Sequence, residues 1–356
     1  MTLDGIKRHL RNFSSANGQI KIMEVCGTHT SSIFRNGIRG LLSDSIKLVS
    51  GPGCPVCVTP PADIDALIDL AEEAEIVSFG DMFRVPGSSF SLAEARARGA
   101  HVRLMYSPFE VLSLAKEQPS TQFVIAAVGF ETTAPVYAAL MDALAAEGLC
   151  NVQLYTALKT MPEVLEYICM NEATDAFLCP GHVSAVIGSA VYEPLCGKYK
   201  KPFVIAGFEA EHILAAVYEI IHQIEEGRYT VRNLYPSVVS RDGQQKALAL
   251  LDKYFEKTDS YWRGIGEIKN SGFRIKDEYA RFSANKNKTD IYASKEKSPP
   301  PGCRCTDVML GRINPDECVL FGKTCTPQHP VGACMVSAEG ACGIWNSESG
   351  TGSKTK

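Results

Sequence analysis

Short, continuous apolar runs alternate with helical patterns over the first 227 residues of the chain. Runs of four to six apolar residues are typical of strands buried on both faces of a parallel sheet. The sequence predicts eight strands, most of them such runs: Ile20–Val25, Ile46–Ser50, Ile76–Phe79, Val102–Met105, Phe123–Val128, Val152–Thr156, Ala176–Leu178 and Phe203–Ala206. The helices expected between them, several opening on Pro or an acidic residue, are Pro61–Ala74, Leu92–Arg98, Pro108–Lys116, Ala134–Glu147, Pro162–Asn171 and Ala210–Glu226. This alternation favours an α/β fold with parallel sheets.

Changes in the pattern predict where the domains end. The polar stretch Glu117–Gln122 divides the strand–helix region, and one more helix is expected at Gly243–Phe255. The polar, charged stretch Ser283–Gly302 contains three consecutive prolines, as a linker or an exposed loop would. We therefore expect two parallel-sheet α/β domains, at 1–118 and 119–235, and a region at 236–356 that holds a helical linker and a small cysteine-rich domain.

Composition changes this picture mainly through cysteine. The net charge of −4 gives no reason to expect nucleic acid or an anionic membrane as a partner, and no apolar run reaches the roughly 18 residues of a membrane span. The first residues are charged and amphipathic, unlike a signal peptide, so a cytoplasmic, reducing location is expected. Six of the 13 cysteines fall between Cys303 and Cys342. In a reducing compartment such crowding indicates a metal site or catalysis before structural disulfides.

The loop Cys26-Gly27-Thr28-His29 follows the first predicted strand, at the end of a parallel strand where ligands bind. A thiol at the start of a helix is expected to have a lowered pKa. His29 could pair with that thiol, or both side chains could hold a soft divalent metal. The structural alternative is a helix cap beside a buried thiol.

The loop Cys54-Pro55-Val56-Cys57 follows the second predicted strand. Its Cys-x-x-Cys spacing suits two thiolates on one metal or a reversible disulfide, and flanking Pro and Gly predict a rigid, exposed turn. Because no second Cys-x-x-Cys completes a zinc ribbon, a redox dithiol is preferred to structural zinc and to an inert loop.

Two further loops follow later strands. Glu131, with Thr132 and Thr133, stands where a helix amino terminus would be capped or would bind an anion. His182 follows Pro-Gly at a strand end and is expected to face a cleft, although a lone histidine is more often structural. The P-loop, Rossmann, nucleophile-elbow and zincin motifs are missing from the sequence, which argues against an ordinary nucleotide-binding, hydrolase or metalloprotease site.

The carboxyl-terminal cysteines number more than the four that one tetrahedral zinc ion needs. Six thiols in a segment rich in Pro and Gly suit an iron–sulfur cluster on four cysteines plus one extra pair. Structural zinc and a disulfide knot are the alternatives.

Taken together, these motifs resemble the HypD family of hydrogenase maturation proteins. The resemblance covers nearly the whole chain and rests on CGTHT, GPGCPVC, GFETTAP, PGHVSAVIG, FGKTCTP and GACMVSAEGAC in that order. It implies two α/β domains and a third domain with a [4Fe-4S] cluster, in surroundings similar to those of ferredoxin:thioredoxin reductase. It also implies a complex with the small partner HypC, which receives cyanide made by HypF and HypE. On that complex the Fe(CN)2CO unit of [NiFe]-hydrogenase is assembled before delivery to the large-subunit precursor.

The resemblance also assigns roles to residues. Cys26 is the expected ligand of the mononuclear Fe(II), together with a cysteine of HypC, while Cys54 and Cys57 match a thiol pair that relays electrons from the cluster. Side chains expected to act on the ligands at the iron, or elsewhere in the site, are Thr28, His29, His182 and Glu131. The expected cluster ligands are Cys303, Cys318, Cys325 and Cys342, which leaves Cys305 and Cys334 as the extra pair.

Two other classes of function stay open at this point. One is a thiol–disulfide oxidoreductase of the ferredoxin:thioredoxin-reductase type, in which Cys54 and Cys57 act on protein disulfides. The other is a zinc-stabilised interaction protein without a redox role.

Overall fold

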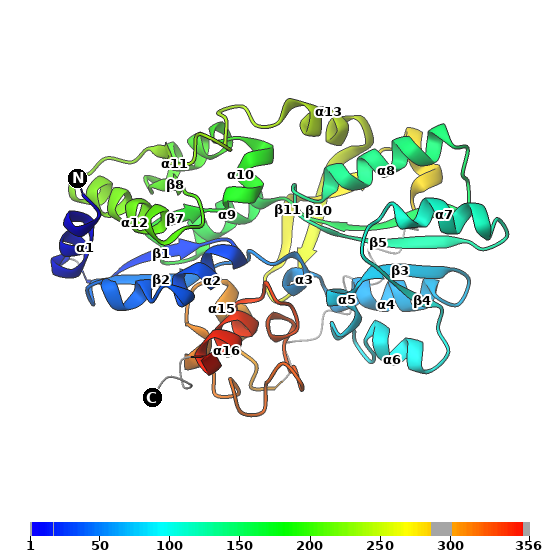
Figure 1. The fold of residues 1–356 in the computed structure, drawn as a ribbon, viewed down its shortest axis with the longest axis horizontal. Coiled ribbons are helices and arrows are strands. Elements are labelled where there is room, and N and C mark those ends of the chain that lie inside the picture. Colours follow the sequence, from blue (N-terminus) through cyan, green and yellow to red (C-terminus); the bar gives the residue numbers. More distant parts are fainter. Residues whose placement is uncertain (1, 17, 286–300, 352–356) are drawn as a thin grey trace. The chain divides into compact units, whose positions relative to one another are not determined.

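The structure is a computed structural model that describes residues 2–16, 18–285 and 301–351 (Figure 1). Most of the predicted proline-rich linker, residues 286–300, lies outside the described residues. The chain forms two compact units. Unit 1 comprises Met1–Cys54, Val164–Gln244 and Pro301–Lys356, and unit 2 comprises Pro55–Glu163 and Gln245–Pro300.

Unit 1 is built on a five-stranded parallel sheet with the strand order β2-β1-β7-β8-β9. Its strands are β1 Ile20–Glu24, β2 Ile46–Ser50, β7 Ala176–Cys179, β8 Phe203–Ile205 and β9 Val231–Asn233. Its helices are α1 Leu3–Asn12, α2 Gly27–Arg35, α10 Gly181–Ile187, α11 Glu193–Tyr199, α12 Ala210–Glu225, α15 Cys305–Met309 and α16 Ala341–Thr351. Short 3-10 turns lie at Ile38–Leu41, Ala190–Tyr192, Pro315–Glu317 and Ala333–Met335. Apolar side chains of α1, α2 and α12 pack against β1, β7 and β8 to form the core of this unit.

Unit 2 contains a four-stranded parallel sheet with the order β4-β3-β5-β6 and an antiparallel hairpin, β10-β11. Its strands are β3 Glu75–Phe79, β4 Val102–Met105, β5 Phe123–Gly129, β6 Val152–Leu158, β10 Phe255–Trp262 and β11 Gly266–Ile275. Its helices are α3 Pro55–Val58, α4 Pro61–Leu70, α5 Gly80–Phe83, α6 Leu92–Ala97, α7 Glu110–Glu117, α8 Ala134–Ala146 and α13 Gln245–Tyr254, with a 3-10 turn at Asp277–Phe282. The chain passes from unit 2 back to unit 1 between Glu163 and Val164, inside α9, Met161–Asn171.

The predicted α/β architecture with parallel sheets is confirmed, but the chain is divided differently from the predicted boundaries. Strands β1 and β2 share a sheet with β7, β8 and β9, whereas β3 to β6 form the second sheet. The chain thus leaves unit 1 after Cys54 and returns to it at Val164, so a break near residue 118 falls inside unit 2. The cysteine-rich segment belongs to unit 1 rather than to a body of its own.

That segment packs against α2 (Figure 1). A Cβ atom on Gly27 would stand 2.6 Å from the carbonyl oxygen of Glu339, so glycine is what allows the backbone of the segment to approach here. The rings of Phe34 and Trp345 meet edge to face with centroids 4.6 Å apart. The residues that follow Cys26 are therefore in direct contact with the loop that leads into α16.

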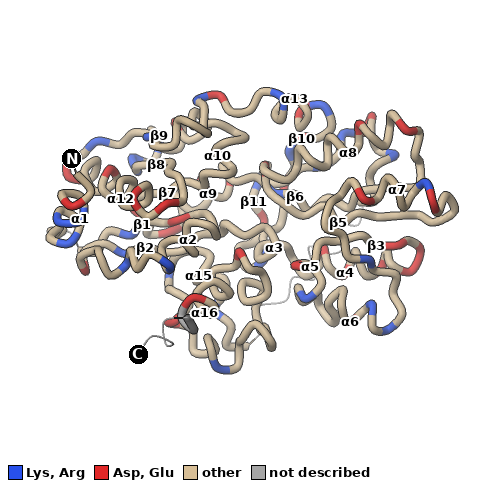
Figure 2. Tube along the Cα trace, in the orientation of Figure 1, with Lys and Arg blue, Asp and Glu red and all other residues tan. Residues whose placement is uncertain are grey.

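Neither charge nor hydropathy adds a further feature to the fold. Figure 2 shows acidic and basic residues distributed over both units. No helix within the described ranges is both long and apolar enough to cross a membrane.

Candidate functional site

Cys26 lies between the carboxyl end of β1 and the first residue of α2. It occupies the position that caps the helix, although no side chain completes the cap. Burial raises the pKa of the Cys26 thiol more than the backbone N–H groups of His29 and Thr28 and the Thr28 hydroxyl lower it. The expected lowering of this pKa at a helix start is therefore wrong, because lost hydration outweighs the helix terminus. A bound cation would compensate the thiolate charge and favour the deprotonated form.

His29 is completely buried on the first turn of α2. Its Nε2 atom lies 3.2 Å from the carbonyl oxygen of Gly207, and because a carbonyl only accepts, Nε2 carries the proton. The other ring nitrogen, Nδ1, is buried and has no hydrogen-bond partner among the described residues. Burial lowers the pKa of His29 to about 4, which keeps the imidazole neutral at pH 7. A neutral ring whose second nitrogen is fixed by a backbone carbonyl is the usual state of a metal-binding histidine.

Phe208 lies against two histidines of unit 1, His29 and His182. Its ring centroid is 4.8 Å from that of His29 and 4.3 Å from that of His182. His182, at the start of α10, is exposed, and partial desolvation lowers its pKa. A Cβ atom on Gly181 would stand 2.9 Å from the Phe208 ring, so the glycine before His182 makes this packing possible. The structure thus brings His29, three residues after Cys26, and His182 against the same aromatic side chain.

The loop that carries Cys54 packs against the loop that carries Cys26. A Cβ atom on Gly53 would stand 2.7 Å from the backbone nitrogen of Cys26. Cys54 and Cys57 are both buried, so the predicted exposed turn is wrong with respect to the two thiols. Cys54 ends the first segment of unit 1, while Cys57 belongs to α3 of unit 2.

Glu131 belongs to unit 2, whereas Cys26 belongs to unit 1. It follows β5, and its Oε1 accepts the backbone N–H of Met161 at 2.8 Å. Its Oε2 is buried without a hydrogen-bond partner within the described part of the chain, and burial raises the pKa of Glu131 to about 7. Thr133, at the start of α8, forms no side-chain cap. An anion site at this loop stays a prediction.

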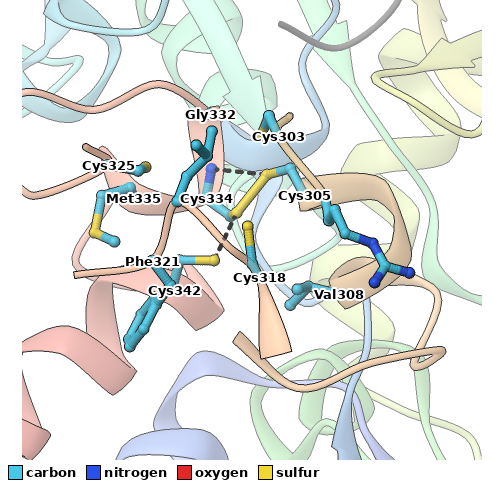
Figure 3. Close-up of a pocket in the computed structure, with 12 residues that line it drawn as sticks. Cys303, Cys305, Val308, Cys318, Phe321, Cys325, Gly332, Cys334, Met335 and Cys342 are labelled. Carbon is cyan, nitrogen blue, oxygen red and sulfur yellow. Dashed lines mark hydrogen bonds between the residues drawn. A yellow bond between two sulfur atoms is a disulfide. The ribbon is translucent and has the colours of Figure 1, made fainter. Parts of the chain in front are cut away.

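The six cysteines of the carboxyl-terminal segment line one small cavity (Figure 3). Cys305, on α15, and Cys334 are joined by a disulfide. The sulfur atoms of Cys334 and Cys342 lie 3.1 Å apart. The four lining cysteines outside this disulfide are Cys303, Cys318, Cys325 and Cys342. The remaining lining is mostly apolar and includes Val308, Leu320, Phe321 and Met335.

Local contacts make this cavity suitable for sulfur-ligated iron. A Cβ atom on Gly332 would stand 2.7 Å from the Cys303 sulfur, so glycine leaves room for it. The backbone N–H of Val331 donates to the Cys325 sulfur at 3.4 Å, the kind of contact that tunes iron–sulfur centres. Burial raises the pKa of Cys342, and three neighbouring thiols, those of Cys325, Cys303 and Cys318, raise it further. Four such thiols become thiolates together only when a cation compensates their charge.

The number of cysteines bears on the kind of metal site. A [4Fe-4S] cluster takes one thiolate on each iron, four in all. Four cysteines outside the disulfide line the cavity, so their number fits such a cluster. One structural zinc ion also takes four ligands, and zinc stays an alternative.

Two residues of this region were given no role from the sequence. Glu24, the last residue of β1, is buried next to the Cys26 loop, and burial raises its pKa to about 7. A carboxylate near the end of a predicted buried strand was the available signal. Phe208 follows β8, so the rule that directs attention to the carboxyl ends of parallel strands would have included it.

Comparisons with known proteins agree on one family. The family model described as "HypD: Hydrogenase formation hypA family" matches residues 2–348. The chain is 41% identical over 339 residues to the hydrogenase maturation factor HypD of Rhodobacter capsulatus, covering 93% of this chain and 90% of the relative. It is 40% identical over 349 residues to the hydrogenase maturation factor HypD of Escherichia coli (strain K12), covering 95% and 92% of the two chains. Similarity of this extent spans both units and the cysteine-rich segment.

Proposed function

The chain belongs to the HypD family of hydrogenase maturation factors, and from that premise we propose that it is an iron–sulfur scaffold that holds Fe(II) while the Fe(CN)2CO unit of [NiFe]-hydrogenase is assembled. HypC supplies a second cysteine to the iron and carries the finished unit to the large-subunit precursor. HypE, charged by HypF, delivers the cyanide. These partners follow from the family resemblance and are part of the proposal.

The observation that carries the proposal is the pair of Cys26 and His29. A thiol and a neutral imidazole, whose Nδ1 lone pair has no partner among the described residues, both stand in the first turn of one helix. Sulfur and imidazole nitrogen are ligands that suit iron. Burial around them favours strong-field ligands, because cyanide and carbon monoxide need an electron-rich iron from which water is excluded.

The side chains around the iron divide into acceptors and donors. His29 Nδ1 carries no proton, so it accepts a hydrogen bond or binds iron rather than donating to a ligand. The Thr28 hydroxyl and His182, both exposed, are placed to donate to cyanide nitrogen. Phe208 packs against both imidazoles and excludes water from one side.

The cysteine-rich segment is proposed to bind a [4Fe-4S] cluster through Cys303, Cys318, Cys325 and Cys342. When bound, the cluster supplies single electrons for reduction. Cys305 and Cys334 form the pair beside it, and Cys54 and Cys57 are the proposed dithiol between the cluster and the iron. The contact between Gly27 and Glu339 supports this link, because it joins the Cys26 loop directly to the cysteine-rich segment.

Membership of this family favours the maturation scaffold over a thiol–disulfide oxidoreductase that acts on protein substrates. The two functions differ at Cys26, which an oxidoreductase based on Cys54 and Cys57 does not need.

Infrared spectroscopy of the complex purified with HypC under anaerobic conditions tests the proposal. We expect CN and CO stretching bands, which vanish in Cys26→Ala while the visible absorption of the cluster stays. Cys150→Ala, which removes an exposed thiol, is the matched control and should keep the bands. A wild-type complex without such bands would refute the proposed function.

A further inference from the structure

The buried carboxylate of Glu24 is the point where three parts of unit 1 meet. Glu24 is the last residue of β1 and only 1% exposed. Its Oε1 accepts the hydroxyls of Thr30 and Ser50, each at 2.6 Å, and its Oε2 accepts the backbone N–H of Cys26 at 3.5 Å. A buried carboxylate is costly unless it is hydrogen-bonded, so these three donors are what retain it in the fold.

The three donors belong to, or lie next to, the two loops that carry Cys26 and Cys54. Thr30 lies in α2, four residues after Cys26, and Ser50 ends β2, four residues before Cys54. Glu24 and Ser50 are directly paired in the parallel register of β1 and β2, which places their side chains on the same face of the sheet. The carboxylate therefore ties the Cys26 loop to the Cys54 loop.

Backbone contacts between the same two loops leave little freedom for their relative position. The N–H of Gly51 donates to the carbonyl oxygen of Glu24 at 2.8 Å. Gly53 lies against the backbone of Val25 and Cys26 at distances that no Cβ atom would allow. The carboxylate is the part of this junction that also reaches the helix, through Thr30.

A cation in the same unit attracts Glu24 without a hydrogen bond to it. The guanidinium of Arg39 is stacked on Trp345 of α16, with Cζ 4.6 Å from the ring centroid. Its three nitrogen atoms are buried and lack a hydrogen-bond partner in the described ranges. Burial lowers the pKa of Arg39, and the charge of Glu24 opposes this effect by favouring the charged form of the guanidinium. The position of Glu24 is thus set by its hydroxyl donors, and Arg39 contributes only a longer-range attraction.

We propose that Glu24 is a positioning residue for the iron-binding thiol: its carboxylate fixes the Cys26 loop against the Cys54 loop and so sets the direction in which the Cys26 sulfur meets iron. This inference rests on the function proposed above, since it concerns the same thiol. Residues that orient metal ligands in this way change metal affinity about 10–100-fold when they are replaced.

Three variants and one control test the role of Glu24 in the complex with HypC. Glu24→Gln keeps the shape of the side chain but replaces one acceptor oxygen with an NH2 group. That group faces either the N–H of Cys26 or the two hydroxyls, where the carboxylate oxygen accepted a hydrogen bond. Thr30→Val and Ser50→Ala each remove one donor, and they keep the test decisive if Glu24→Gln does not fold. Thr30→Ser retains the hydroxyl and is the matched control.

The readouts are iron content, the CN and CO stretching bands, the visible absorption of the cluster and the melting temperature. We expect Glu24→Gln to lower bound mononuclear iron about tenfold or more and to shift the remaining bands, with cluster absorption unchanged. Thr30→Val and Ser50→Ala should shift the bands in the same direction, and Thr30→Ser should not. Bands and iron content like those of the wild type in all three variants, even with a lower melting temperature, would reduce Glu24 to a structural role and overturn the inference. Absence of bands from the wild type itself would instead contradict the proposed function.

Discussion

The Nε2–H of His29 donates to the carbonyl oxygen of Gly207, and this one contact decides which ring nitrogen carries the proton. The carbonyl comes from the loop after β8, whereas His29 follows β1, so the pairing depends on how the sheet of unit 1 is ordered. It leaves Nδ1 buried and without a partner among the described residues. An unsatisfied buried nitrogen costs about 1–3 kcal/mol, a cost that a bound metal or proton donor would remove.

Replacing His29 with Gln is expected to change how stability depends on pH. The folded pKa of about 4 lies below the ordinary histidine pKa of 6.5, so the unfolded chain binds more protons between these two values. The wild type should therefore lose about 3 kcal/mol relative to His29→Gln as the pH falls from 6.5 to 4. Urea unfolding followed by the fluorescence of Trp345, in a chain whose other tryptophan, Trp262, is replaced by Phe, measures this difference. Stability curves that run parallel from pH 7 to pH 4 would contradict it.

Removal of single cysteines is expected to separate cluster ligands from the extra pair. Cys318→Ala should lose most of the roughly four iron and four acid-labile sulfide per chain that a [4Fe-4S] cluster carries. Cys334→Ala should keep both, because its sulfur is already engaged with Cys305 rather than left for iron. Metal and sulfide analysis after anaerobic purification measures the two variants side by side. About one zinc per chain without sulfide, in the wild type, would favour the structural-zinc alternative.

The individual strands could be predicted from the sequence because most are continuous apolar runs, and Ile46–Ser50 agrees with β2 to the residue. The hairpin of β10 and β11 was missed, since its buried positions alternate with exposed ones and form no such run. How the strands divide between sheets could not be predicted. Glu24 pairs with Leu178, far along the chain, and local patterns carry no information on such pairings.

Part of the candidate site could be predicted once the strands were predicted. The motif loops all follow parallel strands, so their thiols and histidines were found by position. The role of Glu24 could not be found in this way, because it depends on Ser50 standing beside it in the register of β1 and β2. The raised pKa of Cys26 depends on burial, which a loop sequence does not reveal.

Glu131→Gln is expected to stabilise unit 2 at high pH. Burial raises the pKa of Glu131 to about 7, from its ordinary value of 4.5, so the folded state favours the neutral carboxyl. The stability that neutral Glu131 contributes is present at low pH and is lost as the pH rises through 7. Glu131→Gln should therefore exceed the wild type by up to about 3 kcal/mol at pH 8 and differ little near pH 4.5. Urea unfolding at the two pH values measures this, with Glu117→Gln at an exposed position as control. An advantage of Glu131→Gln that is equal at both pH values would show that Glu131 stays ionised in the fold.

Gly27→Ala is expected to loosen the cysteine-rich segment from α2. The new Cβ atom would stand 2.6 Å from the carbonyl oxygen and 3.0 Å from the Cα of Glu339, both backbone atoms that cannot rotate away. Overpacking of this kind costs about 1–3 kcal/mol, which exceeds what alanine gains over glycine in a helix.

Gly40→Ala is the matched control in the same unit, since no atom lies within 4 Å of its Cβ position and its φ is not left-handed. It should leave stability unchanged or raise it by up to about 1 kcal/mol. Urea unfolding followed by Trp345 fluorescence reports on both variants, because Trp345 contacts Phe34 of α2 across the same interface. Equal stability of Gly27→Ala and Gly40→Ala would mean that the loop before α16 does not contact Gly27. The direct link between the cysteine-rich segment and the loop that carries Cys26 would then have to be abandoned.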